Sequence, residues 1–498
     1  MEDSESLNAD SKAHGEKSAS KPNKAMRLAQ TLFVLLCAET IFSLPYRSVY
    51  LLRQSIPQAW LVALFVLVVI CACYRLRQPV LRTLSSMLDA PSIGNKVWLS
   101  FWIGVGLALR VVWALRFPVT LSSDSLIYFD VAAKMAHGQA IASVFNPPGL
   151  SLFLAPFFML FGARTWVPIL CALLLFVATY LFTYGLAARI QGGLAARIAP
   201  MLVAIWPCCF TLVGGNSKEN LLAALVPATL YFYLKSFNPK IDLSEINVHW
   251  GYLIAAGLCM GFAALTQPGY LLFPSVLIGF ELLRARRLLK AAARVTVFSI
   301  AMLSIITPWT VRNYIVFHRI VLISTNGGSV FYRANNSNAN AQYEPESEAS
   351  LPKDEFEADK LGYKMGEDWI VHNPKAFAVL MIRKQVVFLG DDALGAFETF
   401  KFHIDHPSPL YAPAKAISNL FWLVLWSVMF LGFPLLFKLE NWRLWYGILF
   451  LPFLYQWAID SVFESGPRHH VPYAALIAVL VGMVLSSAAP KIPNGQST

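Results

Sequence analysis

The feature that most constrains the fold is a series of apolar runs, several of which reach the ~20 residues that a helix needs to cross a bilayer core. Apolar residues make up 57% of the chain and charged residues only 14%, whereas a soluble domain carries about 25% charged residues. Because an α-helix satisfies its own backbone hydrogen bonds in lipid, these runs predict membrane-spanning helices. The sequence therefore predicts an all-α polytopic membrane protein.

The run lengths predict about 12 transmembrane helices. They lie near residues 28–45, 58–75, 97–117, 165–188, 198–214, 220–236, 251–267, 269–283, 294–310, 413–437, 442–459 and 471–487. A further run, 148–162, is only about 15 residues long and begins at Pro147-Pro148. It is short for a span, so we expect a re-entrant or interfacial helix there.

The lysines and arginines gather in the loops that follow the second, fourth, sixth, eighth and tenth expected spans. With the N-terminus inside, all of these loops are cytoplasmic, as the positive-inside rule requires. This holds only if 148–162 does not cross. The cations form no single basic patch, so the net charge of +11 does not indicate a nucleic-acid partner. The outward face then holds the loop 118–164, a segment of about 100 residues at 311–412, and the turns between spans.

This layout gives the expected domain organisation. It comprises a disordered cytoplasmic tail (1–27), two additional N-terminal spans with a cytoplasmic loop (28–96), a transmembrane core (97–310), an outward periplasmic or lumenal loop domain (311–412), C-terminal spans (413–487) and a cytoplasmic tail (488–498).

Neither the cysteines nor the histidines predict a metal site. All seven cysteines lie in apolar runs and show neither a disulfide framework nor zinc-ligand spacing. His469 and His470 are adjacent, and neighbouring side chains on a helix point apart, so they are a weak metal signal. The sequence indicates no metal-binding residue and no cofactor with certainty, and it leaves a divalent metal open.

Two of the outward segments carry carboxylates. Asp124 stands at the start of an expected surface helix, with Tyr128 one turn further on. An alternative role for Asp124 is to cap that helix. The next outward turn contains Lys218 and Glu219, which are also explained as a solvated turn.

Cations and polar groups occupy the other outward segments. Arg312 and Asn313 follow the ninth expected span, Lys384 lies in the outward segment, and Arg468 lies in the last outward turn. Tyr270 follows a Pro-Gly turn. A reaction on an anionic lipid needs this layout, because a carboxylate can take the proton of a hydroxyl and a guanidinium can hold a phosphate.

The order of these motifs resembles the GT-C superfamily of membrane glycosyltransferases, and in particular the family-39-like branch with protein O-mannosyltransferases and lipid A aminoarabinose transferases. The resemblance covers residues 97–487. It rests on Asp124 with Tyr128, Pro147-Pro148-Gly149, Phe161-Gly162, Lys218-Glu219, Gln267-Pro268-Gly269-Tyr270, Pro308-Trp309 with Arg312-Asn313, Ser324 to Gly328, Asn373-Pro374 with Lys384, and Arg468 with Pro472.

The resemblance implies transfer of a sugar from a polyprenyl-phosphate donor to a hydroxyl of a lipid, glycan or protein acceptor, with inversion. It implies that Asp124 is catalytic and that Arg312 and Arg468 contact the donor phosphate. The implied substrate-binding set is Tyr128, Lys218, Glu219, Tyr270, Arg312, Asn313, Lys384 and Arg468. The expected location is the bacterial inner membrane, with the site facing the periplasm.

Two departures from the family pattern bear on these roles. Ser123 and Ser125 flank Asp124 where the family often has two adjacent acids, which puts a metal at this position in doubt. The last turn reads Arg468-His469-His470 rather than Arg-Tyr-Arg. Three other interpretations stay open: a secondary transporter or flippase, a polysaccharide polymerase or ligase, and an inactive relative that binds lipid. A transporter would instead place polar groups near the bilayer midplane of two related halves.

Overall fold

The computed structural model describes residues 24–53, 55–89, 93–237, 248–284, 288–341, 347, 350–402 and 408–490. Residues 1–23 and 491–498, which make up most of the two expected tails, lie outside the described residues. Every regular element in the described ranges is a helix, so the predicted all-α class is confirmed.

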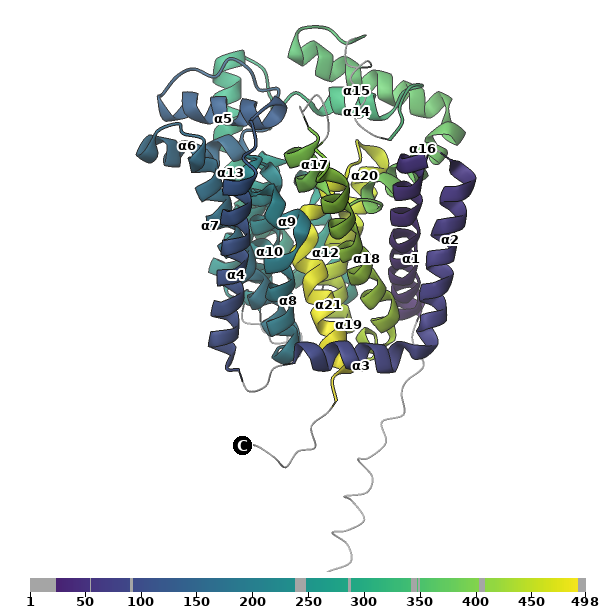
Figure 1. The fold of residues 1–498 in the computed structure, drawn as a ribbon. Helices are drawn as coiled ribbons and strands as arrows, with labels where there is room; N and C mark the ends of the chain where they lie inside the picture. The colour runs from purple at the N-terminus through teal and green to yellow at the C-terminus, as the bar shows by residue number, and fades with distance from the viewer. Residues whose placement is uncertain are drawn as a thin grey trace, which may run out of the picture.

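The helices run back and forth between two ends of a bundle (Figure 1). Its members are α1 (Lys24–Arg53), α2 (Ile56–Cys73), α4 (Asn95–Arg116), α7 (Trp166–Ile190), α8 (Gly193–Ile205), α9 (Pro207–Thr211), η2 (Leu212–Gly214), α10 (Lys218–Lys235), α11 (Trp250–Thr266), η3 (Pro268–Leu272), α12 (Pro274–Arg284), α13 (Leu288–Phe317), α18 (Tyr411–Leu436), α19 (Trp442–Trp445), η5 (Tyr446–Phe450), α20 (Leu451–Val462), η6 (Pro467–Tyr473) and α21 (Ala474–Ala488).

The remaining helices lie at the two ends of this bundle. They are η1 (Tyr74–Leu76), α3 (Arg77–Leu88), α5 (Ser123–Ala136), α6 (Gly149–Phe161), α14 (Gly327–Ala334), α15 (Glu355–His372), α16 (Pro374–Leu389) and α17 (Leu394–Phe400).

Seven helices among the described residues are long and apolar enough to cross a membrane, or eight if the bent pair of α8 with α9 and η2 is one span. The expected number of 12 is therefore not confirmed, although the multi-pass membrane character is. Some expected spans are short or broken helices. The 47° bend between α8 and α9, for example, occurs at Trp206, whose ψ of 115° is extended because Pro207 disfavours the α conformation in the residue before it.

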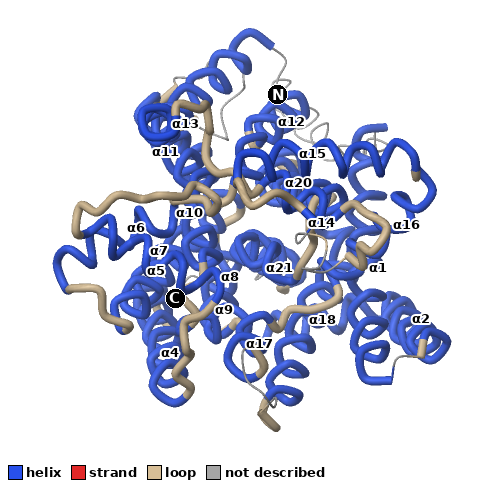
Figure 2. Tube along the Cα trace, turned by 90° about the horizontal axis from the view of Figure 1, so that it is seen from above, coloured by secondary structure: helices blue, strands red, loops and turns tan. Residues whose placement is uncertain are grey.

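Helix α21 occupies the centre of the bundle when it is seen along its length (Figure 2). Small residues let the neighbouring helices approach it closely. A Cβ at Gly482 would lie 3.0 Å from the carbonyl oxygen of Ala195 on α8, and a Cβ at Gly432 on α18 would collide with Val484. Close packing of this kind drives helix association in lipid. The hydrophobic effect does not, because lipid tails are as apolar as the helix surfaces.

One end of the bundle carries α5 and α6 together with α14 and α15, and α3 lies along the opposite end (Figure 1). Helix α6 has 13 residues and packs beside α5, in keeping with the expectation that 148–162 does not span. Gly328 and Gly362 bring α14 and α15 into backbone contact, because a Cβ on either would overlap the other helix. All helices of the expected outward segment thus gather at the end where α5 begins.

Candidate functional site

The N-terminus of α5 places Asp124 without using it as a cap. The backbone N–H of Ser122, the N-cap residue, donates to Oγ of Ser125 over 3.0 Å, and that hydroxyl donates back to the carbonyl of Ser122. Ser123 has φ = 49°, a left-handed conformation that costs on the order of 1 kcal/mol in a residue with a side chain. Among the described residues, no capping bond to the Asp124 carboxylate is found, so the capping alternative is not supported.

The second outward turn is tied directly to the same helix. Nδ2 of Asn216 donates to the carbonyl oxygen of Ser125 over 2.8 Å. Asn216 also has a positive φ, 47°, which asparagine tolerates better than most residues. Two residues later the chain enters α10, whose first turn carries Glu219. The side chain of Asn216 therefore brings the carboxylates of α5 and α10 to one place.

Arg468 connects these carboxylates to the last outward turn. Its guanidinium lies 3.9 Å from Oδ2 of Asp124 and 3.2 Å from Oε1 of Glu464. Glu464 also accepts two bonds from Arg333 on α14, at 2.5 and 3.1 Å. Burial alone would raise the pKa of Glu464, but Arg468 and Arg333 lower it below its ordinary value. The contact with Glu464 is thus a fixed anchor, whereas the Asp124 carboxylate is 53% exposed and only loosely held.

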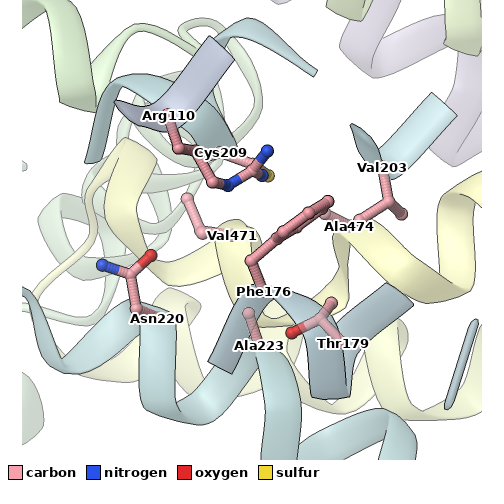
Figure 3. Close-up of a pocket in the computed structure, with 9 residues that line it drawn as sticks. All are labelled: Arg110, Phe176, Thr179, Val203, Cys209, Asn220, Ala223, Val471 and Ala474. Atoms are coloured by element: carbon pink, nitrogen blue, oxygen red, sulfur yellow. The ribbon is translucent and has the colours of Figure 1, made fainter. Parts of the chain in front are cut away.

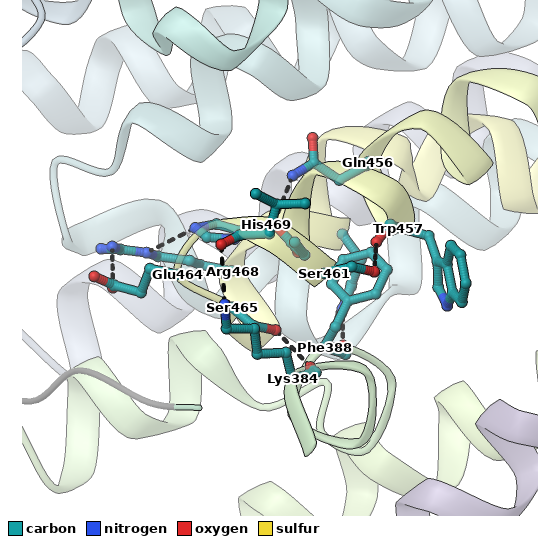
Figure 4. A network of polar contacts seen from close by, with 12 residues as sticks. Lys384, Phe388, Gln456, Trp457, Ser461, Glu464, Ser465, Arg468 and His469 are labelled. Carbon is teal, nitrogen blue, oxygen red and sulfur yellow. Dashed lines mark hydrogen bonds and ion pairs between the residues drawn. The ribbon is translucent and has the colours of Figure 1, made fainter. Parts of the chain in front are cut away.

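The neighbouring histidine orients the guanidinium of Arg468. Nε of Arg468 donates to Nε2 of His469 over 3.3 Å, so the ring proton is on Nδ1, which donates to Asp460 over 2.9 Å. Gln456 donates to the same Asp460 oxygen. Figure 4 shows Arg468 between Glu464 and His469 in this network.

Lys384 contacts the turn that carries Glu464 and does not face Asp124. Its ammonium donates to Oδ1 of Asn335 and to the carbonyl of Val462, each over 3.0 Å, and its own carbonyl accepts from Ser465 (Figure 4). Burial lowers its pKa to about 7, partly offset by Asp460 and Glu464. The side chain therefore joins α16, α14 and the turn that carries Glu464.

Three carboxyl groups of the site have a buried oxygen atom without a hydrogen-bond partner in the described part of the chain: Glu219 (Oε1), Glu398 (Oε2) and Asp460 (Oδ2). The other oxygen of Glu219 accepts from Ser217. Glu398 lies on α17, and burial together with the charge of Glu219 raises its pKa to about 8 against the opposing effect of Arg468. Burial, Asp124 and Glu219 also raise the pKa of Tyr128, which is only 4% exposed.

Arg312 and Asn313 lie outside this group, whereas burial, with smaller effects from the charges of Asp460 and Glu219, raises the pKa of Tyr270. Arg312 donates to the carbonyl of Ile141 over 2.5 Å and packs over Trp309, so it holds the loop between α5 and α6. Asn313 is fully buried and donates to the carbonyl of Val321 over 3.1 Å. Tyr270 is buried in the main apolar core. No contact in the described ranges joins any of the three to Asp124 or Arg468.

The adjacent histidines have separate partners. His470 bonds Asp392 over 2.9 Å and stacks on Trp422, with ring centroids 4.4 Å apart, whereas His469 faces Asp460. In the part of the chain that the structure describes, no three His, Cys, Asp or Glu side chains are grouped so that they could hold one metal ion.

A small cavity adjoins the site on the side of the bundle interior (Figure 3). Asn220, which follows Glu219, and Val471, which follows His470, line it together with Arg110. Arg110 is 3% exposed, donates to the carbonyls of Gly106 and Ala204, and stacks on an aromatic ring. Its charge lies within the helix bundle, where an ionisable group is costly.

One segment of the chain matches a known family. Residues 146–311 match the family model of dolichyl-phosphate-mannose-protein mannosyltransferases. The predicted resemblance is confirmed for this segment. No curated protein matches the chain.

Two kinds of solved structure are similar to the chain. The oligosaccharyltransferase AglB from Archaeoglobus fulgidus, in complex with an inhibitory peptide and a dolichol-phosphate, is 15% identical over 78% of this chain and 50% of AglB, with a TM-score of 0.47. The chain thus spans about half the length of that protein. ArnT from Cupriavidus metallidurans, bound to undecaprenyl phosphate, is 15% identical over 78% of this chain and 77% of ArnT, with a TM-score of 0.39.

Sequence reasoning missed three members of the site: Arg333, Glu398 and Glu464. Glu398 had a detectable signal, since it is a lone carboxylate among the apolar residues of Leu394–Phe400. Glu464 stands four residues before Arg468, which is the spacing of a helical ion pair. Arg333 gave no local signal, because its partner is 131 residues away in the chain.

Proposed function

We propose that the protein is a membrane glycosyltransferase that moves a sugar from a polyprenyl-phosphate donor to an acceptor hydroxyl. The observation that carries the proposal is the loose, half-exposed contact between Asp124 and Arg468 at one end of a helix bundle. An exposed ion pair contributes only about 0–1 kcal/mol, so a substrate can separate the two side chains at little cost. The family match at 146–311 supports the same activity.

The two side chains suit the two halves of the reaction. The acceptor oxygen attacks the anomeric carbon and gives its proton to Asp124, while the bond from that carbon to the phosphate oxygen breaks. The leaving group becomes a phosphomonoester, so negative charge grows on it. Arg468 can meet two phosphate oxygens at once, and its anchors on Glu464 and His469 keep it aimed before charge develops. Attack from the face opposite the phosphate gives inversion.

The location and partners follow from the same arrangement. The donor is a polyprenyl-phosphate sugar that reaches the site from the bilayer, and the acceptor is a lipid, glycan or protein at the membrane surface. The sites on α5, α14 and η6 lie at the end of the bundle opposite α3, whose sequence begins with Arg77. Cation-rich loops mark the cytoplasmic side. We therefore propose the periplasmic face of a bacterial inner membrane.

Mass spectrometry of lipid-linked sugars and envelope glycans tests this function for any donor sugar. Cells that lack the protein are complemented with wild type, Asp124→Asn or Asp130→Asn. Asp130 is exposed on the same helix and serves as the matched control. A positioned base contributes about 10²–10⁴-fold, so we expect wild type and Asp130→Asn to restore one glycan modification and Asp124→Asn to fail at equal protein level. If no glycan depends on the protein, the proposal is wrong.

A further inference from the structure

The carboxyl groups of Glu219 and Glu398 reach the site from different elements, the first turn of α10 and the short helix α17. Glu219 is 5% exposed, and the unbonded oxygens of both groups are shielded from solvent. Because each of these oxygens lacks a hydrogen-bond partner, they do not bond to each other. A buried polar atom left unbonded costs about 1–3 kcal/mol, so a pair of them at a functional site points to a ligand group that bonds both.

The backbone is shaped to admit the Glu398 carboxyl. A Cβ at residue 215 would lie 2.2 Å from its Oε2, so a side chain there would push the carboxyl away and glycine leaves it room. Gly215 precedes the Asn216 bond that fixes the turn to α5. The position of Glu398 therefore depends on the same turn that places Glu219.

The charges around the pair determine what it can bind. Two carboxylates that interact in a buried site do not both ionise readily, and one keeps a proton. Ser217 donates to Glu219, so this carboxyl already serves as an acceptor, and the pKa of Glu398, raised to about 8, makes Glu398 the group that carries a proton at neutral pH. A protonated carboxyl donates one hydrogen bond and an ionised one accepts. A hydroxyl group, which accepts one bond and donates one, matches both.

We propose that Glu219 and Glu398 form a hydroxyl-binding subsite for the transferred sugar. Glu398 donates a hydrogen bond to a hydroxyl of the sugar ring, and the same hydroxyl donates a hydrogen bond to Glu219. The subsite rests on the proposed glycosyl transfer. It gives Glu398 a role in recognition of the sugar, separate from the phosphate contact of Arg468 and the proton transfer to Asp124.

Substitution by glutamine separates the two roles. Glutamine is neutral and keeps a donor, so it reproduces a protonated Glu398 but not the two acceptor oxygens of Glu219. With the lipid-linked sugar identified by the glycan comparison, Glu398→Gln should retain more turnover than Glu398→Ala, because the amide still donates a hydrogen bond. Glu219→Gln and Glu398→Ala should lose about 10- to 100-fold, the effect of removing a hydrogen bond to a charged or buried group.

The pH dependence of turnover distinguishes the subsite from a purely structural role of Glu398. Glu398 loses its proton as the pH rises through about 8, so wild-type turnover should fall above that pH, while Glu398→Gln should lack this decline. Equal losses in Glu398→Gln and Glu219→Gln, or an unchanged alkaline decline in Glu398→Gln, would overturn the subsite.

Infrared spectroscopy of the purified protein in nanodiscs tests the proton on Glu398 without any substrate. In the difference between the wild-type and Glu398→Gln spectra, we expect a protonated-carboxyl carbonyl band at pH 7 that fades as the pH rises through about 8, and we expect no such band in the difference between wild type and Glu440→Gln. Glu440 is exposed in the turn after α18 and serves as the control. A wild-type minus Glu398→Gln difference spectrum without this band contradicts the proposal. Absence of all glycosyl transfer by the wild type, with the band present, would instead refute the proposed function.

Discussion

At the scale of single residues, the decisive interaction is the anchoring of Arg468. Glu464 and His469 hold its guanidinium on two sides, and the third side faces Asp124 across 3.9 Å. The sequence predicted Asp124, Glu219 and Arg468 as site residues, because ionisable groups next to apolar runs are easily recognised. Their mutual contacts come from chain segments far apart, which no local pattern reports.

Substitution of Arg468 should lower turnover more than it lowers stability. Glu464 keeps its two bonds to Arg333 in Arg468→Ala, so the turn stays folded. Loss of a preorganised donor to the leaving phosphate should cost on the order of 10²-fold in kcat. Arg468→Lys should recover only part of it, since lysine lacks the planar fork. Steady-state kinetics of the purified variants in nanodiscs measure kcat and KM. Normal kcat and KM in Arg468→Ala would leave the arginine as a membrane anchor.

At the scale of elements, the site depends on two turns with unusual backbone conformations, at Ser123 and Asn216. The sequence indicated turns at both places but not the bond between them, because the Asn216 side chain reaches Ser125, 91 residues earlier. Helix breaks were equally hard to predict. The chain bends by 47° between α8 and α9 at Pro207, so hydropathy alone counts as one span a run that is bent.

Replacement of Asn216 tests whether the turn positions the site. Asn216→Gly allows φ = 47° but removes the bond to Ser125, whereas Asn216→Ala removes the bond and strains the backbone. Both should lower turnover, and Asn216→Ala should also be less stable than Asn216→Gly by on the order of 1 kcal/mol. Thermal unfolding and turnover are measured on the same samples. Wild-type turnover in Asn216→Gly would mean that packing alone places α5 against α10.

At the scale of the whole molecule, the two ends of the bundle differ in chemistry. The end with α5, α14 and α15 holds the candidate site with its exposed Asp124, and the other end carries α3 (Figure 1). The distribution of lysine and arginine predicted which segments share an end, because orientation in the membrane depends on charge rather than on packing. The arrangement of helices around α21 was not predictable, since it follows from glycine contacts between distant helices.

Accessibility of single cysteines tests this orientation. In a background with all seven native cysteines replaced by alanine, Lys134→Cys on α5 and Lys364→Cys on α15 should react with a membrane-impermeant maleimide in intact cells. Lys290→Cys, at the start of α13, should react only after permeabilisation. All three lysines are exposed, so burial does not explain a difference. The positive-inside rule requires the cation-rich loop near residue 290 to be cytoplasmic. Labelling of Lys290→Cys in intact cells would mean that α6 crosses the membrane. The cation-rich loop would then lie on the same side as Asp124, and the predicted orientation would be wrong.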